Sequence, residues 1–469
     1  MEVIVVLPPN PVNEPWHNGP FAPVGRLDSG NGWNLKIVEV IDMAVRNAVG
    51  IQSRIRVLYA SFGLSQASST AVDALILLFA AKVLLAPERH IALLDAVGYF
   101  ANTIAAIAFS LLWHHSPGKR IFAVFGFLGM GIPIFLFSSI GTMWMAYTLT
   151  TLFEALMILP GAITTSYLLE THSRAELPSA YGQLHASGFL GSALGLLLSM
   201  GWLAVASHFV GGGIGERTLF AVLGVLAVLA AAGAWHATVG MDAAQDKVGL
   251  FQRLSHAVST LRTWFRWRHH HTPRLGAKPL SEPVLNDSMK IFLLLTTLLY
   301  AGMGMSFTGT LLYMISELEV LPSLTLLAIL IFRLAASLVS NPAGNHLNQL
   351  MPLRMQQMAG SWRFLAVMVL GLVTLLPVGR WGIMAVLPLV AACGISWGIM
   401  GVTGPVSASA MVATKRQPAA YLMFVAASSG ATGAGAWLAS LTAPTLGFPA
   451  LFGISGLIFG SALLLWHKL

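Results

Sequence analysis

Long runs of apolar residues, separated by short polar turns, recur along almost the whole of this chain. Most of them are long enough to cross a hydrocarbon core of about 30 Å, which takes roughly 20 helical residues. Backbone groups find no water in such a core, so these segments fold as α-helices. The pattern predicts twelve membrane-spanning helices, at residues 57–84, 91–113, 121–140, 143–169, 180–207, 217–239, 291–315, 321–342, 360–379, 381–411, 419–442 and 446–467.

Two pairs of stretches, 241 and 240 residues apart, have similar sequences. Each pair falls at corresponding helices of the two halves, so we favour an internal repeat over chance matching of small and apolar residues. The prediction is an all-α integral membrane protein with two pseudo-symmetric six-helix bundles, the construction of secondary transporters. The matched residues are Leu58, Tyr59, Ala60, Gly63 and Ser65 with Leu299, Tyr300, Ala301, Gly304 and Ser306, and Ala180, Tyr181, Ala186 and Gly195 with Ala420, Tyr421, Ala426 and Gly435.

Polar stretches set the predicted boundaries of the parts. Residues 1–35 are rich in Pro, Gly and Asn and are expected to be a flexible cytoplasmic segment. The apolar residues of 36–56 share one helical face, which fits an amphipathic helix on the membrane surface or an extension of the first span. A basic linker at 241–288 separates the predicted bundles, 57–240 and 289–469.

The composition agrees with a membrane location, because 56% of the residues are hydrophobic and only 9% are charged, against about a quarter in soluble domains. When charges at span edges are counted with the adjoining loop, 21 of the 26 Lys and Arg residues fall on one side. This bias predicts that both termini are cytoplasmic and that the chain lies in a cell membrane. The net charge of +8 is spread over seven segments, whereas a nucleic-acid partner needs a gathered basic surface.

No cofactor and no metal site is expected. The His269-His270-His271 tract lies in the predicted linker, where a solvated loop fixes no coordination geometry. The single cysteine, Cys393, excludes an intramolecular disulfide. No loop gathers the carboxylates or metal ligands of an enzyme site, and no ATP-binding loop suggests a primary pump. The expected partners are the lipid bilayer and a small-molecule substrate, with the protein as a monomer.

Three ionisable residues fall in the middle of predicted spans: Asp73, Glu154 and Arg333. Each opposes insertion by about 2.5–3.5 kcal/mol unless it pairs or faces water. We hypothesise that Asp73 or Glu154 binds a coupling proton and that Arg333 pairs with a carboxylate or an anionic substrate group. A purely structural ion pair is the alternative. Asp95 and His185 lie near predicted span ends and are expected at the membrane interface.

Twelve spans, two similar halves and a basic central loop resemble the major facilitator superfamily of transporters, over about residues 50–467. That family places a Gly-x-x-x-Asp-Arg-x-Gly-Arg-Arg turn between its second and third helices. Here Gly118, Lys119 and Arg120 match the end of the turn, but His115 stands in the acidic position. The resemblance implies that this turn latches the closed state, with other partners than those usual in the family.

The resemblance also implies where the substrate cavity lies. In this family the first, seventh and tenth helices carry substrate contacts. The polar and amphipathic residues on these helices of the present chain are Gln66, Tyr300, Ser306, Tyr313 and Trp397. They are the candidate cavity residues, and a helix-packing hydrogen bond is the alternative role for each.

These features together predict a secondary active transporter that moves a small organic solute by alternating access, coupled to protons. The alternative is a carrier-like protein that no longer transports and acts as a sensor or assembly factor, delivering a pigment or a metal to a partner. His115 in the acidic position of the turn favours this alternative modestly.

Overall fold

The computed structural model describes residues 32–112, 119–209, 214–238, 287–347, 351–377, 379–412 and 416–466, with most side chains from residue 53 onward. Residues 1–52 and Ser53–Leu469 form two separate units, and the following description concerns the second. The predicted flexible segment up to residue 31, the side chains of the predicted amphipathic helix up to residue 52, and the linker up to residue 286 lie outside the described residues.

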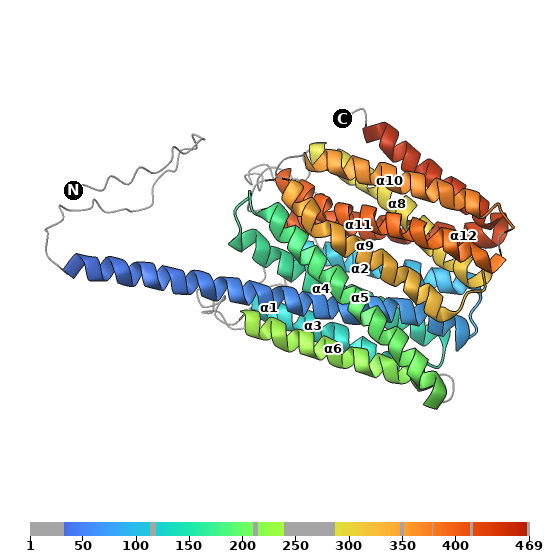
Figure 1. The fold of residues 1–469 in the computed structure, drawn as a ribbon, viewed down its shortest axis with the longest axis horizontal. Helices are drawn as coiled ribbons and strands as arrows, with labels where there is room; N and C mark the ends of the chain where they lie inside the picture. The colour runs from blue at the N-terminus through green and yellow to red at the C-terminus, as the bar shows by residue number, and fades with distance from the viewer. Residues whose placement is uncertain are drawn as a thin grey trace, which may run out of the picture. The chain divides into compact units, whose positions relative to one another are not determined.

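The described residues fold into helices, with no strand among them (Figure 1). This is the all-α class that the apolar runs predict. The elements are α1 (Gly32–Lys82), α2 (Glu88–Leu112), α3 (Lys119–Phe137), α4 (Met143–Thr171), α5 (Leu177–Phe209), α6 (Ile214–Thr238), α8 (Asp287–Ser316), α9 (Pro322–His346), α10 (Pro352–Val373), the 3-10 turn η2 (Gly379–Gly382), α11 (Ile383–Ala410) and α12 (Gln417–Trp466).

Nine helices in the described part of the chain are long and apolar enough to cross a membrane. The multi-pass character predicted from the sequence is therefore confirmed. Two helices are not among the nine: α3, which has a shorter apolar stretch at Phe125–Phe137, and α10, which carries Arg354 and Arg363. The helix α12 counts as one of the nine although its backbone breaks at Gly447.

Local sequence signals set several helix ends. Met145 N–H donates to the Thr142 side chain at 3.3 Å, which caps the start of α4. Pro322 occupies the first turn of α9, where no N–H partner is needed. Gly447 breaks α12 with φ 79° and ψ 173°, a conformation that needs a residue without a Cβ. The chain after this break lies beside α8 and α10 through Phe452 and Phe459.

Helices α1 and α5 cross with their backbones in direct contact. A Cβ atom added at Gly191 would meet the backbone of Gly63, and one added at Gly195 would meet the backbone of Ala67. Small residues four positions apart permit such a close approach between membrane helices. The crossing therefore depends on the absence of side chains at these positions.

Helices α8 and α12 cross in the same way. A Cβ atom added at Gly304 would meet the backbone of Thr432, and one added at Gly435 would meet the backbone of Ala301. Gly63 matches Gly304 and Gly195 matches Gly435 in the sequence repeat. The two crossings thus join matched segments, although Gly435 meets Ala301, which the repeat pairs with Ala60 and not with Ala67.

Residues before position 239 and residues after position 286 meet most extensively along two helix pairs, α2 with α12 and α5 with α9 (Figure 1). In the α5–α9 pair, Gly182 faces Gly344, and Ser179 Oγ donates to Asn345 Oδ1 at 2.9 Å. Large apolar clusters lie on both sides of this junction, one mainly in α8 to α12 and one in α1 to α4 and α6. These contacts leave a polar space between the helices that carry them.

The α1–α5 crossing predicts opposite effects for two glycine substitutions on α5. Gly195→Ala places a Cβ against the backbone of Ala67 and should lower the free energy of unfolding by about 1–3 kcal/mol. Gly201 is exposed, and a Cβ there meets nothing within 4 Å, so Gly201→Ala should raise it by about 0.5–1 kcal/mol. Thermal unfolding of both purified variants measures the difference. Equal effects would contradict the packing described here.

Candidate functional site

A cavity of about 310 Å³ lies among helices α1, α2, α4, α5, α8, α9, α11 and α12. Its volume is at the lower end of the range of about 300–1,000 Å³ found for ligand pockets, which suits a small molecule. Polar and charged groups line the part formed by α1, α2 and α4, and aromatic rings line much of the part formed by α8, α11 and α12. The two walls therefore differ in chemistry.

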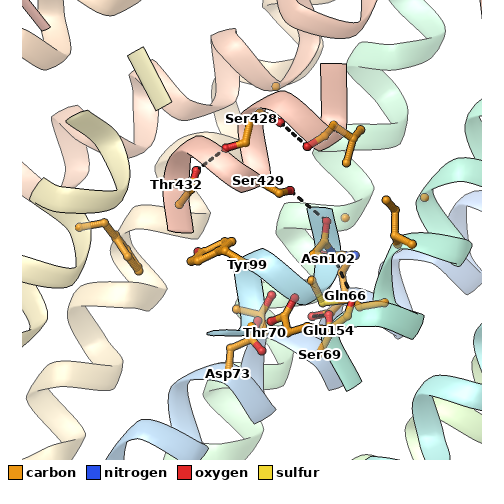
Figure 2. A pocket seen from close by; sticks show the side chains of 18 of the residues that line it. Gln66, Ser69, Thr70, Asp73, Tyr99, Asn102, Glu154, Ser428, Ser429 and Thr432 are labelled. Atoms are coloured by element: carbon orange, nitrogen blue, oxygen red, sulfur yellow. Dashed lines mark hydrogen bonds between the residues drawn. The ribbon is translucent and has the colours of Figure 1, made fainter. Parts of the chain in front are cut away.

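Two carboxylic acids form the centre of the polar wall. Asp73 of α1 and Glu154 of α4 lie next to each other, with Ser69 and Thr70 around them (Figure 2). Glu154 is buried, and its Oε2 atom has no hydrogen-bond partner among the residues that the structure describes. Gly98 of α2 permits this position, because a Cβ there would lie 2.9 Å from Glu154 Cγ. The pair therefore sits at the bottom of a tightly packed polar surface.

Helix α2 contributes Asp95, Tyr99 and Asn102 to the same wall. The spacing of four and then three residues places them on one face of the helix. Two of them bond to helices of the other part of the chain. Thr308 Oγ1 donates to Asp95 Oδ2 at 2.6 Å. Ser429 Oγ donates to Asn102 Oδ1 at 2.9 Å (Figure 2). Polar side chains thus join α2 to α8 and to α12 beside the cavity.

Arg333 of α9 is the one Lys or Arg residue among the described residues that line this cavity. Its guanidinium lies over two rings, 5.8 Å from the centroid of Phe189 and 5.8 Å from that of Phe332. Its Nε atom is buried, and no described residue offers it a hydrogen bond. Within the described part of the chain no carboxylate comes within 4 Å of its nitrogens, so Arg333 makes no ion pair there.

A second arginine, Arg363 of α10, lies deeper in the same region, with 1% of its surface exposed. Its Nη1 atom donates to the Cys393 carbonyl at 3.2 Å, and its guanidinium lies 5.9 Å from the Phe332 centroid and 5.8 Å from that of Trp397. A small cavity of about 30 Å³ is lined by both Arg333 and Arg363. The sequence-based count of Lys and Arg assigns Arg363, near the start of the predicted span 360–379, to the adjoining cytoplasmic loop. In the structure it lies three turns inside α10, which begins at Pro352.

Six of the residues selected from the sequence come together at the large cavity. They are the three ionisable residues Asp73, Glu154 and Arg333 and the three candidate contacts Gln66, Tyr300 and Trp397.

Ser306 and Tyr313 lie elsewhere. Ser306 donates to the Met303 carbonyl at 3.1 Å and lines a separate cavity of about 30 Å³, and Tyr313 packs 5.3 Å from the Phe448 ring centroid. An α-helix turns by about 100° per residue. Around the axis of α8, the side chains of Ser306 and Tyr313 therefore point more than about 100° away from the direction of Tyr300.

The residues of the predicted gating turn give less information. His115 and Gly118 lie outside the described residues. Lys119 and Arg120 begin α3, but their side chains are also outside the described part. The latch at this turn stays a prediction.

Sequence reasoning missed several cavity residues. Asp95 and His185, expected at the membrane interface, line the cavity, and the His185 ring lies 6.0 Å from that of Phe189. Tyr421 lines it as well. The spacing of Asp95, Tyr99 and Asn102 on one helical face is a signal that could have identified that wall.

Comparison with known proteins identifies the fold. No protein-family model matches the chain, and no curated protein matches it in sequence. Among solved structures, the human organic anion transporter MFSD10 (TETRAN) matches with a TM-score of 0.61 and 11% identity, over 89% of this chain and 99% of that chain. A variant of the nucleoside transporter NupG gives a TM-score of 0.61 and 12% identity, over 88% and 99% of the two chains.

A third solved structure, of a POT family transporter in complex with a thioalcohol-conjugated peptide, matches with a TM-score of 0.63 and 13% identity, over 87% of this chain and 94% of that one. All three proteins are named as transporters, and none is named as an enzyme. The chain thus shares the fold of these three transporters.

The environments of two arginines predict opposite effects on stability. Arg363 holds a buried charge with one hydrogen bond, so Arg363→Met should leave the free energy of unfolding unchanged or raise it by about 1 kcal/mol. Arg217 donates to the carbonyls of Ser138 and Ile140 at 2.7 Å each, so Arg217→Met should lower it by about 2 kcal/mol. Thermal unfolding of the two purified variants compares them. An equal loss in both would show that Arg363 is a structural residue.

Proposed function

We propose that this chain is a secondary active transporter that carries a small organic solute across a cell membrane by alternating access, coupled to protons. One observation carries this proposal: a cavity holding three carboxylic acids and an arginine lies between helices from the two parts of the chain. Ionisable groups at membrane depth are costly and mark solute and ion pathways. Transporters of this construction place their sites between the two halves.

The proposed architecture has twelve spans in two six-helix bundles, 57–240 and 289–469, joined by the linker 241–288. Two observations support this number. Helices α3 and α10 lie beside the nine helices that are long and apolar enough to span, and the break at Gly447 divides α12 into two segments. We further propose that both termini are cytoplasmic and that the protein acts as a monomer.

The solved structures support a small organic solute in general terms. Those proteins are named as transporters of an organic anion and of a nucleoside, and as a transporter in complex with a peptide conjugate. The cavity of about 310 Å³ suits a solute of modest size.

The adjacent carboxyl groups of Asp73 and Glu154 are the proposed site of the coupling proton. Two negative charges side by side at membrane depth repel each other and are poorly solvated. A single proton removes the repulsion and leaves one poorly solvated charge in place of two, so the pair offers a natural place for a transported proton. Other ionisable groups also line the cavity: Asp95, Tyr99, His185, Tyr300, Arg333 and Tyr421.

Contacts between the two parts of the chain supply the elements that a gate needs. Asp95 with Thr308 and Asn102 with Ser429 join the parts beside the cavity. Ser179 with Asn345 joins them where α5 meets the end of α9. Single hydrogen bonds of this kind contribute only about 0.5–1.5 kcal/mol each, so they can break and re-form as the two bundles rock.

The proton site predicts the effect of two neutralising substitutions. In proteoliposomes with a pH-sensitive dye inside, a transported solute from a panel should drive proton movement. Asp73→Asn or Glu154→Gln should lower this solute-driven proton movement at least about tenfold, because the pair then loses its shared proton site.

Matched controls use carboxylates outside the cavity. Asp287, which pairs with Lys290 at 2.9 Å, and Glu176, between α4 and α5, are exposed. Asp287→Asn and Glu176→Gln should therefore leave the flux unchanged. Unchanged flux in both cavity variants would refute the proton site. A protein that binds a solute but moves neither solute nor protons would favour the sensor or assembly-factor alternative.

The contact between Ser179 and Asn345 predicts that a covalent link will stop transport. Ser179→Cys with Asn345→Cys, in a Cys393→Ser background, should cross-link with a short bifunctional thiol reagent, because the two side chains lie within hydrogen-bond distance. Cross-linking should abolish solute exchange, and each single-cysteine variant should keep it after the same treatment. Full exchange in the cross-linked protein would contradict alternating access by rocking at this contact.

A further inference from the structure

The contacts of the Arg333 guanidinium indicate which kind of ligand it binds. Its Nε atom is buried without a partner among the described residues, whereas its two terminal nitrogens form no hydrogen bond with those residues and are not among the fully buried unpaired atoms. The terminal nitrogens therefore face the cavity. The rings of Phe189 and Phe332 lie near the guanidinium and limit how it can turn. A planar fork of donors held in this way matches a carboxylate, which accepts two parallel hydrogen bonds.

The carboxyl groups of the cavity do not satisfy this fork. Asp73 is the carboxylic acid whose charge acts most directly on Arg333. It lies next to Glu154 and forms no ion pair with Arg333. Asp95 accepts a hydrogen bond from Thr308 at 2.6 Å. A cationic solute could bind to the acidic wall, but it would leave Arg333 charged and unpaired, which costs free energy in a desolvated site. The geometry favours an anion.

Aromatic rings also line the cavity near Arg333. Tyr300 lies edge-on to Trp397, with centroids 5.7 Å apart, and edge-on to Phe424 at 6.0 Å. All three residues line the cavity together with Arg333. Aromatic surfaces at these angles accept a flat apolar body by stacking or edge contact.

We infer that the solute is a small organic monoanion, a carboxylate on a planar apolar body, whose carboxylate binds the terminal nitrogens of Arg333. The inference rests on the proposed transport function and names the class of its solute. A single negative charge fits because Arg333 is the one cation among the described residues that line the cavity. One proton on the Asp73 and Glu154 pair would then make the translocated charge zero.

The test is a binding measurement with ligands that share a ring and differ in charge. Benzoate, benzamide and benzylamine, and the corresponding 2-naphthyl series, are added to the purified full-length protein in detergent at one fixed pH. Binding is measured as the concentration-dependent rise in the midpoint of thermal unfolding. At least one of the two carboxylates should stabilise the protein, and its amide and amine should stabilise it roughly ten- to a hundredfold more weakly.

Variants then assign the binding to Arg333. Arg333→Gln should reduce the affinity for the carboxylate roughly ten- to a hundredfold, and Arg333→Lys should recover part of it, because a lysine keeps the charge but not the fork. Arg354→Gln, at an exposed position of α10, is the matched control and should bind as the unchanged protein does. The midpoint without ligand shows that each variant is folded.

Three outcomes would overturn the inference: neither carboxylate binds, the amide or amine binds as well as its carboxylate, or Arg333→Gln binds normally. These results are independent of transport. A neutral or cationic solute that is accumulated on a pH gradient would leave the proposed function intact and refute the anion site. A carboxylate that binds through Arg333 but is never transported would support the anion site and refute the proposed transport function.

Discussion

The cost of holding charged groups at membrane depth is the constraint on which the rest of this structure depends. Asp73, Glu154 and Arg333 lie in apolar runs, where each charge costs about 2.5–3.5 kcal/mol unless it meets a partner or a polar space. The fold meets this cost by gathering them at one cavity, together with Asp95. Helices must therefore stand apart around the cavity and still pack closely elsewhere.

At two helix crossings outside the cavity, the backbones themselves are in contact, in addition to the packed side chains of the apolar clusters. The α1–α5 crossing uses Gly191 and Gly195, and the α8–α12 crossing uses Gly304 and Gly435. Lipid tails are as apolar as leucine, so helices in a bilayer gain little from the hydrophobic effect and depend on such contacts. The two crossings support opposite walls of the cavity, one rich in carboxyl groups and one rich in aromatic rings.

The sequence predicted the fold better than the site. Apolar runs and the internal repeat depend on many residues, and the resulting all-α, multi-pass fold agrees with the solved transporters. Charged residues in the middle of a span, such as Asp73, could also be found from the sequence, because they interrupt an apolar run. Asp95, His185 and Arg363 were missed because the position of a residue along a predicted span does not show which residues the other helices bring next to it. Tyr313 was selected by type, although its position on α8 points away from the face that carries Tyr300.

The glycines of the two backbone crossings are not among the residues that line the large cavity, and of them only Gly304 lines the small cavity that Arg333 and Arg363 share. Positions that hold the scaffold together and positions that meet a solute are therefore largely separate sets. A substitution at Trp397 or Tyr300 alters the cavity surface without disturbing the contact between Gly63 and Gly191. In evolutionary terms, a chain built in this way can change what it carries while its architecture is inherited intact, and proteins that share only 11–13% of their residues with it can keep the same fold.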